Sequence, residues 1–175
     1  MMARLATHAE SGETPMLERT RFREALPRDA ADQAEVFHHA VMEGASSRYT
    51  LSQREAWSAA LPRTAEAWMA RQTLYPTLVA ECDGHCVGFC ERDANDGRIE
   101  TLYVWPAITR QGVGSRLLEL SLEALLAAGH ARVLIDASLM LAPALEARGW
   151  TRLAEETVER FGESLPRVRL AFDRA

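Results

Sequence analysis

Two glycines, Gly112 and Gly114, stand directly before a long amphipathic stretch, and this arrangement suits phosphate binding. The segment from Thr109 to Gly129 reads TRQGVGSRLLELSLEALLAAG. The first N–H groups of a helix have no acceptors within the helix, and the helix dipole adds partial positive charge there. Glycine has no Cβ atom, so a ligand can approach the backbone closely. We predict a phosphate-binding turn, with a tight turn that binds nothing as the alternative interpretation.

The residues around these glycines exclude the two commonest nucleotide motifs. A P-loop would need lysine and then serine or threonine after its last glycine, whereas Ser115 and Arg116 follow Gly114. A dinucleotide fingerprint would need a small residue where Leu117 stands, and it would follow the first strand of a parallel sheet. A different kind of phosphate site is therefore predicted.

The glycine turn needs a strand before it and a strand after its helix. Alternating patterns predict strands over residues 77–81, 85–93 and 98–105, joined by turns that contain Asp-Gly. After a helix of about four turns that ends at Gly129, the apolar residues 131–137 predict a further strand. A crossover of this length makes that strand parallel to the third strand of the meander.

The remaining elements complete one domain. Patterns and end signals predict strands over residues 17–25, 150–162 and 165–172, and helices over 27–44, 51–61, 64–72 and 141–149. The first 16 residues are polar and without pattern, so we interpret residues 1–16 as an N-terminal tail. Residues 17–175 are predicted to form a single α+β domain on a mixed sheet.

Composition narrows the function classes further. The net charge of −5 comes from 25 acidic and 20 basic residues spread along the chain, which argues against nucleic acid as a partner. No stretch has the apolar length of a membrane span or of a signal peptide, so we expect a cytoplasmic protein. Cys82, Cys86 and Cys90 are expected to be free thiols that fill a sheet, and no metal site is predicted.

Two segments together resemble the GNAT N-acetyltransferase superfamily. In that family a strand leads into a loop of pattern Gln/Arg-x-x-Gly-x-Gly/Ala, and residues 102–118, LYVWPAITRQGVGSRLL, are similar in the strand, the proline, the spacing and both glycines. Residues 136–150, DASLMLAPALEARGW, are similar to the family's Asn-Ala-Ser segment, proline and short helix that ends in Gly-aromatic. The similarity extends from about Leu17 to the C-terminus.

The resemblance implies a fold, a cosubstrate and a reaction. The fold is a three-layer α/β arrangement with a mostly antiparallel sheet of six to seven strands and a splayed parallel pair. The reaction is the transfer of an acetyl group from acetyl-CoA to the primary amine of a small molecule or peptide by direct attack. The cofactor-binding residues that it implies, for pantetheine and pyrophosphate, are Leu102, Tyr103, Val104, Thr109, Arg110, Gln111, Gly112, Val113, Gly114 and Ser115.

Three positions depart from the family pattern. Thr109 stands where the loop has Gln or Arg, Asp136 replaces the usual asparagine, and Leu145 replaces a tyrosine that protonates the leaving thiolate. A thiol pKa of about 8.5 makes the thiolate a tolerable leaving group. By alignment with the family, Ser138 is the polar residue nearest to the missing tyrosine, and it is our candidate donor of a proton to the leaving thiolate. Its alternative interpretation is a helix cap. The change at Leu145 also motivates an alternative function, a noncatalytic acyl-CoA sensor.

Glu100 is the candidate general base. It lies two residues before Leu102, and regular alternation puts it on one face with Leu102 and Val104, where apolar neighbours would raise its pKa. An exposed glutamate paired with Arg98 or Arg132 is the alternative interpretation. Glu91 is a weaker candidate.

The acceptor pocket is expected beside the first two helices. By the resemblance, residues 43–57 form its wall, with Tyr49 and Trp57 in contact with the substrate, although core packing explains Trp57 equally well. The acidic net charge favours a cationic acceptor. Because members of the family often dimerise, we also expect a possible homodimer that pairs through an edge strand at residues 165–172.

Overall fold

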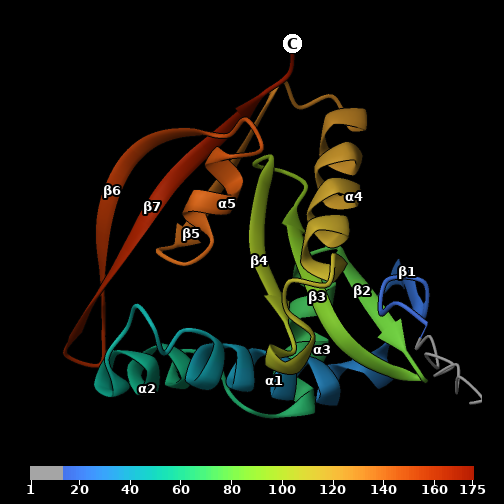
Figure 1. Cartoon of the computed structure of the whole chain (residues 1–175), viewed down its shortest axis with the longest axis horizontal. Coiled ribbons are helices and arrows are strands. Elements are labelled where there is room, and N and C mark those ends of the chain that lie inside the picture. The colour runs from blue at the N-terminus through green and yellow to red at the C-terminus, as the bar shows by residue number, and fades with distance from the viewer. Residues whose placement is uncertain (1–13) are drawn as a thin grey trace, which may run out of the picture.

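The computed structural model describes residues 14–175, so the predicted tail lies almost wholly outside the described residues. The strands are β1 (Thr20–Glu24), β2 (Thr77–Cys82), β3 (His85–Asp93), β4 (Arg98–Val104), β5 (Arg132–Ser138), β6 (Thr151–Arg160) and β7 (Glu163–Asp173). They form one sheet in the order β1-β2-β3-β4-β5-β7-β6, in which only β4 and β5 are parallel (Figure 1). The predicted mixed, mostly antiparallel sheet is confirmed.

Helices cover both faces of this sheet. They are α1 (Ala30–His39), which continues into a π-helical turn (Ala40–Gly44), α2 (Leu51–Ala59), α3 (Ala65–Leu74), α4 (Val113–Ala127) and α5 (Ala142–Glu146), with 3-10 turns at Pro27–Asp29 and Pro106–Ile108. One core cluster joins α4 and α5 to the sheet, and a second joins α1 and α3 to the opposite face. The expected three layers are therefore present.

Local signals fix several element ends. The side chain of Thr50 accepts a hydrogen bond from the N–H of Gln53, and the side-chain oxygen of Gln53 accepts one from the N–H of Thr50, so the two residues form a capping box at the start of α2. Gly129 has φ +101° just after α4, a conformation that glycine adopts without strain. No helix within residues 14–175 is long and apolar enough to cross a membrane.

The prediction of an edge strand at residues 165–172 is wrong. β7 pairs with β5 on one side and with β6 on the other, so neither of its edges is open to another subunit. The edge strands of the sheet are β6, next to β7, and β1 at the other end. Strand order depends on long-range pairing, and the residue pattern of a strand does not specify it.

The parallel pair β4 and β5 separates after a short contact. Its register joins Arg98 to Leu134 and Ile99 to Ile135, and no later residues of the two strands pair. Figure 1 shows the two strands diverging toward the α1 and α2 end of the molecule. From Glu100 onward, the side of β4 that faces β5 therefore has no strand partner.

Candidate active site

The glycine turn leads from β4 into α4 with an unusual backbone. After the 3-10 turn at Pro106–Ile108, Arg110 has φ +62° and Gly112, the N-cap of α4, has φ +91°. No side chain caps the helix. The first backbone N–H of α4 that has an acceptor is that of Arg116, which donates to the carbonyl of Gly112. The amides of Val113, Gly114 and Ser115 thus have no acceptor among the described residues.

The two glycines of the turn lie against neighbouring side chains. A Cβ atom on Gly112 would lie 3.4 Å from a methyl group of Leu17, and one on Gly114 would lie 3.4 Å from a methyl group of Val104. The side chain of Val113 is buried in the core and fixes the start of the helix. Free amides, a helix dipole and a backbone without side chains are the elements of an anion site.

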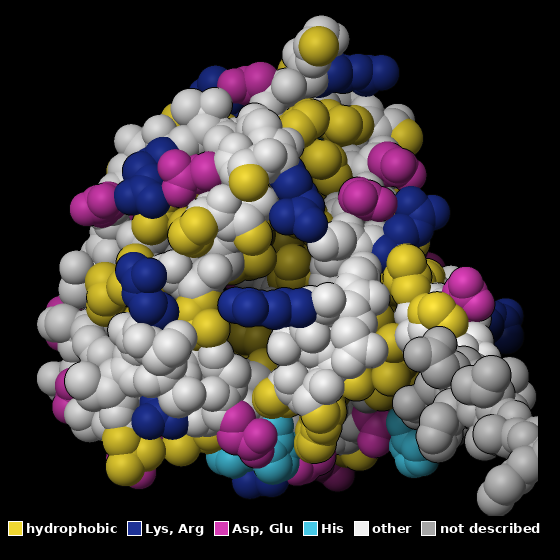
Figure 2. All heavy atoms as spheres, viewed as in Figure 1, with side chains coloured by type: hydrophobic (Ala, Val, Ile, Leu, Met, Phe, Trp, Pro, Cys, Tyr) yellow, Lys and Arg dark blue, Asp and Glu magenta, His cyan; other side chains and the backbone are white. Residues whose placement is uncertain are grey.

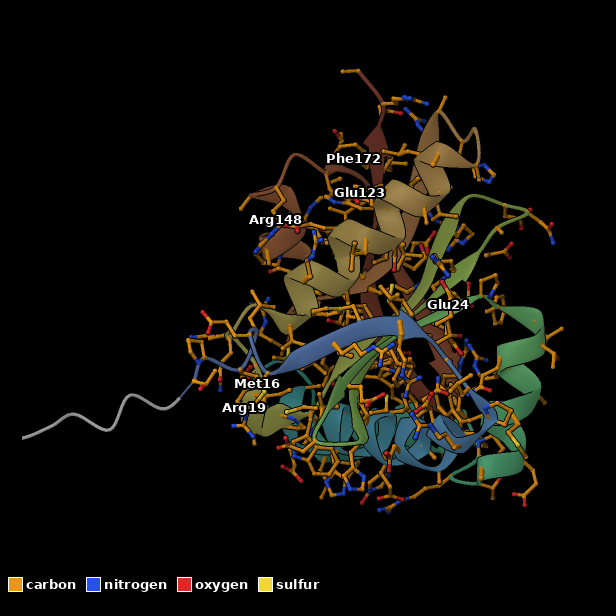
Figure 3. The ribbon with its side chains drawn as sticks, turned by 90° about the vertical axis from the view of Figure 1, so that its right-hand side faces the viewer. Met16, Arg19, Glu24, Glu123, Arg148 and Phe172 are labelled. Carbon is orange, nitrogen blue, oxygen red and sulfur yellow. The ribbon has the colours of Figure 1, made fainter. Side chains whose placement is uncertain are left out.

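Arg148 adds a positive charge to this turn. It follows α5 (Figure 3). Its guanidinium donates a 2.7 Å hydrogen bond to the hydroxyl of Ser115, one of the turn residues. A second hydrogen bond to the carbonyl of Ala144 holds the side chain back toward α5. The sequence gives no indication of this contact, because 33 residues separate the two partners.

We predict that Arg148→Ala weakens the binding of acetyl-CoA about fivefold, which matches the loss of one partly screened charge contact. The effect should shrink as salt is added, because mobile ions screen exposed charges. Calorimetric titration at two salt concentrations measures both. Arg174→Ala, an exposed arginine near the C-terminus, is the control, and equal affinities for the two variants would contradict a role for Arg148.

Glu100 lies where β4 leaves regular pairing. Glu91 of β3 pairs with Thr101 while the next residue, Arg92, pairs with Ile99, so Glu100 is the extra residue of a bulge. The prediction that Glu100 shares a strand face with Leu102 and Val104 assumed regular alternation, and the bulge interrupts that alternation. The side chain of Glu100 is exposed and has no ion pair within residues 14–175, and both Arg98 and Arg132 pair with other carboxylates.

The electrostatic surroundings of Glu100 suit a proton acceptor. Although the side chain is exposed, neighbouring protein atoms remove part of the hydration of its carboxylate and raise its pKa. Arg98 and Arg71 lower that pKa, and the charges of Glu91 and Asp93 add to the increase. A carboxylate with a raised pKa and an open approach can accept a proton.

Glu91, the weaker candidate, is a structural residue. Its side chain is fully buried, and its two oxygens accept hydrogen bonds of 2.9 and 2.7 Å from Arg71 and one of 2.8 Å from the hydroxyl of Thr101. Arg71 also lies over the rings of Trp68 and Tyr75. A carboxylate that is enclosed and paired in this way has no route to a substrate.

We predict that Arg71→Ala destabilises the fold by about 3–5 kcal/mol, because it leaves the buried charge of Glu91 without its partner. Chemical denaturation measures the free energy of unfolding. Arg132→Ala removes an exposed pair with Asp173 and should change the stability little. Equal losses in the two variants would contradict this interpretation.

Ser138 and Leu145 lie beyond the gap, at and after the end of β5. The hydroxyl of Ser138 accepts a 3.2 Å hydrogen bond from the N–H of Leu141, which is the contact that its alternative interpretation as a cap expects. Its own proton remains available as a donor. Leu145 belongs to α5, is 1% exposed and packs in the core between this helix and the sheet. No acidic group therefore stands at the position of the family's tyrosine.

The structure places Tyr49 inside the protein. Its ring is buried, and its hydroxyl donates a 2.7 Å hydrogen bond to the carbonyl of Pro166 and accepts one of 2.9 Å from the N–H of Leu139. It therefore joins β7 to the segment after β5, and this arrangement favours a structural role. Trp57 is partly buried, packs on Tyr49 at 5.2 Å between ring centroids, and faces Tyr103 at 6.4 Å.

A group of charged side chains, here called the arginine network, lies beside the gap. Asp136 of β5 accepts hydrogen bonds from Arg98 of β4, at 2.7 Å, and from Arg169 of β7, at 2.8 and 3.1 Å. Arg167 lies 3.3 Å from Asp136 and 3.1 Å from Glu156 of β6, and Arg169 lies 3.2 Å from Glu156.

Asp136 is a poor proton acceptor. Burial alone would raise the pKa of Asp136, but the hydrogen bond from Arg169 and the charges of Arg167, Arg98 and Arg169 outweigh it and lower that pKa. In the sequence, Asp136 is recognisable only as a departure from the family's asparagine. The alternating Arg167 and Arg169 of β7 were the sequence signal that was missed.

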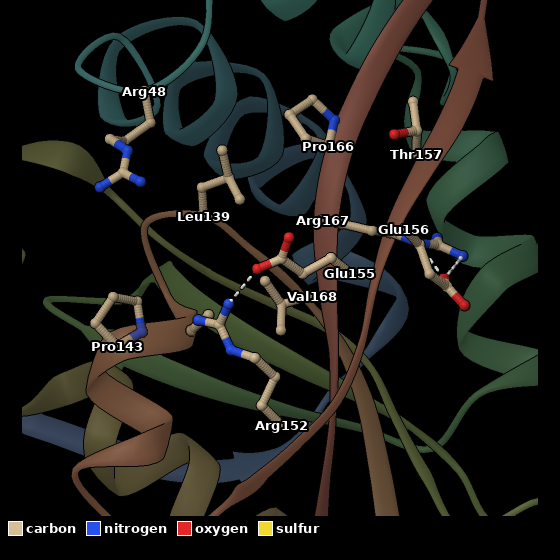
Figure 4. A pocket seen from close by; sticks show the side chains of 11 residues that line it. Arg48, Leu139, Pro143, Arg152, Glu155, Glu156, Thr157, Pro166, Arg167 and Val168 are labelled. Carbon is tan, nitrogen blue, oxygen red and sulfur yellow. Dashed lines mark hydrogen bonds and ion pairs between the residues drawn. The ribbon is translucent and has the colours of Figure 1, made fainter.

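A pocket of about 400 Å³ opens on the α5 side of the sheet. Its walls include Arg48, Leu139 and Arg152, and also Arg167 and Glu156 of the arginine network. Figure 4 shows the Arg167–Glu156 pair across the two strands from Arg48 and Arg152. None of the turn residues 109–115 lines it. Figure 2 shows the same face of the molecule hollowed near its centre, with hydrophobic side chains in the hollow and basic ones across it.

Comparisons with known proteins agree with this geometry. The family described as acetyltransferase (GNAT) domain matches residues 28–166. The GCN5-related N-acetyltransferase of Rhodopseudomonas palustris is 28% identical, with a TM-score of 0.81 over 88% of this chain and 95% of that one. The protein yncA of Salmonella typhimurium, solved with its cofactor acetyl-CoA, is 25% identical, with a TM-score of 0.60 over 89% and 94%.

A more distant structure has the same fold. The PaiA N-acetyltransferase of Thermoplasma acidophilum, in complex with coenzyme A, is 14% identical, with a TM-score of 0.66 over 89% of this chain and 99% of that one. No curated protein matches the chain. The family match spans most of the sequence, including the glycine turn and the splayed strands, and on this basis the chain belongs to the GNAT acetyltransferase family.

Proposed function

We propose that this protein transfers the acetyl group of acetyl-CoA to the primary amine of a small molecule or a peptide. The observation that carries the proposal is the set of free amides at Val113, Gly114 and Ser115, next to a strand, β4, whose backbone has no partner on one side. An anion site beside a free strand edge matches a ligand with a pyrophosphate and an amide-containing arm.

The residues divide the work between binding and chemistry. Residues 109–115 hold the pyrophosphate through backbone amides, and the backbone of Leu102, Tyr103 and Val104 holds the pantetheine arm in the gap. Acetyl-CoA supplies an activated acetyl group as its thioester. Glu100 accepts a proton from the acceptor's ammonium group and so frees the nitrogen lone pair for attack.

The reaction then balances without any other reagent. The amine nitrogen forms a bond to the acyl carbon, and the bond from that carbon to sulfur breaks. The nitrogen releases its second proton, and the departing sulfur gains one to leave as a thiol. Ser138 is the candidate donor for this last proton, directly or through water, because the buried Leu145 offers none.

The test is a calorimetric titration with acetyl-CoA, followed by measurement of free thiol release in the presence of a panel of amines. We expect micromolar binding and release that depends on the amine. Binding without release for every amine would favour the alternative, a noncatalytic acyl-CoA sensor, which the loss of the tyrosine at Leu145 motivates. Absence of binding would contradict both functions.

A further inference from the structure

The arginine network and Glu100 lie on the same side of the sheet. Val168 and Leu170 of β7 pack in the core cluster of α4 and α5, so Arg167 and Arg169, which alternate with them, point to the opposite face. That face carries α1 and α3. The charges of Arg71 on α3 and of Arg98 in the network both lower the pKa of Glu100.

The network has an excess of positive charge. Arg98, Arg167 and Arg169 share two carboxylates, Asp136 and Glu156, which leaves one positive charge unbalanced. The five side chains are between 13% and 35% exposed, so solvent reaches the group but screens it less than it screens a free surface charge. The negative charge of a carboxylate ligand would neutralise the excess positive charge of the network.

A negative charge lies near this positive one. Glu100 and Arg98 are two residues apart on β4, and the charge of Arg98 lowers the pKa of Glu100. One group that attracts an ammonium ion is thus next to a group that attracts a carboxylate. The charges of a free α-amino acid are arranged in the same way, because its ammonium and carboxylate are attached to one carbon atom.

From this arrangement we infer that the acceptor is a free α-amino acid, with its amine at Glu100 and its carboxylate at the arginine network. The inference rests on the proposed function and specifies its substrate class. Acetyl-CoA is held at the start of α4, on one face, and the gap between β4 and β5 leads its thioester through to the other. The acceptor meets it there, and the product is an N-acetyl amino acid.

The local charge thus opposes the expectation from net charge. The whole chain is acidic, which favoured a cationic acceptor, but the residues around Glu100 form a pair of opposite charges. Nearby charges decide affinity because they lie within a Debye length, about 8 Å at physiological salt, and more distant ones are screened. A peptide N-terminus or a polyamine has no carboxylate beside its amine and leaves the network unbalanced.

The experiment compares amino acids with the amines that remain when their carboxylate is removed, such as phenylalanine with phenethylamine and arginine with agmatine. Thiol release with saturating acetyl-CoA gives kcat/KM for each. We expect the amino acids to be favoured at least 100-fold, since charged hydrogen-bonding sites discriminate strongly against ligands that lack the matching group. Equal or better turnover of the decarboxylated amines would overturn the inference while leaving the acetyltransferase function intact.

Two variants test whether the arginine network causes the preference for amino acids over decarboxylated amines. Arg98→Gln keeps two arginines on Asp136 and removes the excess charge, so the preference for amino acids should fall at least tenfold, mainly through KM. Arg132→Gln removes another arginine from a pair between β5 and β7, outside the network, and should leave the preference unchanged. An unchanged preference in Arg98→Gln would place the carboxylate elsewhere, against the inference. Acetyl-CoA binding with no turnover of any compound would contradict the proposed function and this inference together.

Discussion

Gly112→Val raises the dissociation constant for acetyl-CoA by at least 100-fold, or about 2.7 kcal/mol. Two effects combine in this variant. A Cβ atom on Gly112 would already contact Leu17, and we expect the rest of a branched side chain to reach into the space that the pyrophosphate needs beside the amides of Val113 and Gly114. Valine also resists φ +91°, so the turn itself is displaced. Calorimetric titration of the folded variant measures the loss.

A second glycine separates these effects from general strain. Gly129 has φ +101° after α4, at the opposite end of the helix from the turn, and a Cβ atom there meets nothing within 4 Å. Gly129→Val therefore carries comparable backbone strain without blocking the turn. We expect both variants to lose stability and only Gly112→Val to lose the ligand. Similar affinities in the two variants would mean that the turn does not hold the pyrophosphate.

Features set by neighbouring residues were predictable from the sequence. The ends of α2 and α4 follow from the Thr50 capping box and from Gly129, each of which acts within one helical turn. The parallel arrangement of β4 and β5 follows from the crossover through α4. The glycine turn was predicted for the same reason, because its chemistry lies in a few consecutive backbone groups.

Features set by distant contacts were not predictable from pattern alone. Tyr49 was expected to contact a substrate, and the hydrogen bond from its hydroxyl to Pro166, 117 residues away, is a contact that the sequence does not indicate. The position of β7 inside the sheet, the Arg148–Ser115 contact and the arginine network each join segments that only the folded topology brings together. The residue pattern of a strand indicates which face of the strand is buried. It does not indicate which residues of other segments contact that face.

The bulge at Glu100 shows how one irregularity changes a site. Strict alternation would place Glu100 with Leu102 and Val104 against apolar neighbours. The extra residue in β4 instead leaves its carboxylate exposed, beside Arg98 and within the field of Arg71. Its pKa is raised, as predicted, but its neighbours are charged side chains rather than the apolar residues that strict alternation implies.

Glu100→Gln lowers kcat by about 10²- to 10⁴-fold, the usual contribution of a positioned general base, and leaves the affinity for acetyl-CoA unchanged. Glutamine keeps the size of the side chain and removes its ability to take a proton. The control is Glu123→Gln, which alters an exposed carboxylate on α4 and should retain full activity (Figure 3). A Glu100→Gln enzyme with full activity would exclude Glu100 as the base.

The pH dependence separates this proton transfer from the ionisation of the acceptor. Only the carboxylate form of Glu100 accepts a proton, so wild-type kcat falls as the pH drops through its pKa. Because that pKa is raised, the fall should lie above pH 4.3, the usual value for glutamate. The acceptor amine titrates at higher pH and affects both enzymes alike. We therefore expect the lower limb of the profile to disappear in Glu100→Gln and the upper limb to remain, whereas an unchanged lower limb would assign it to another group.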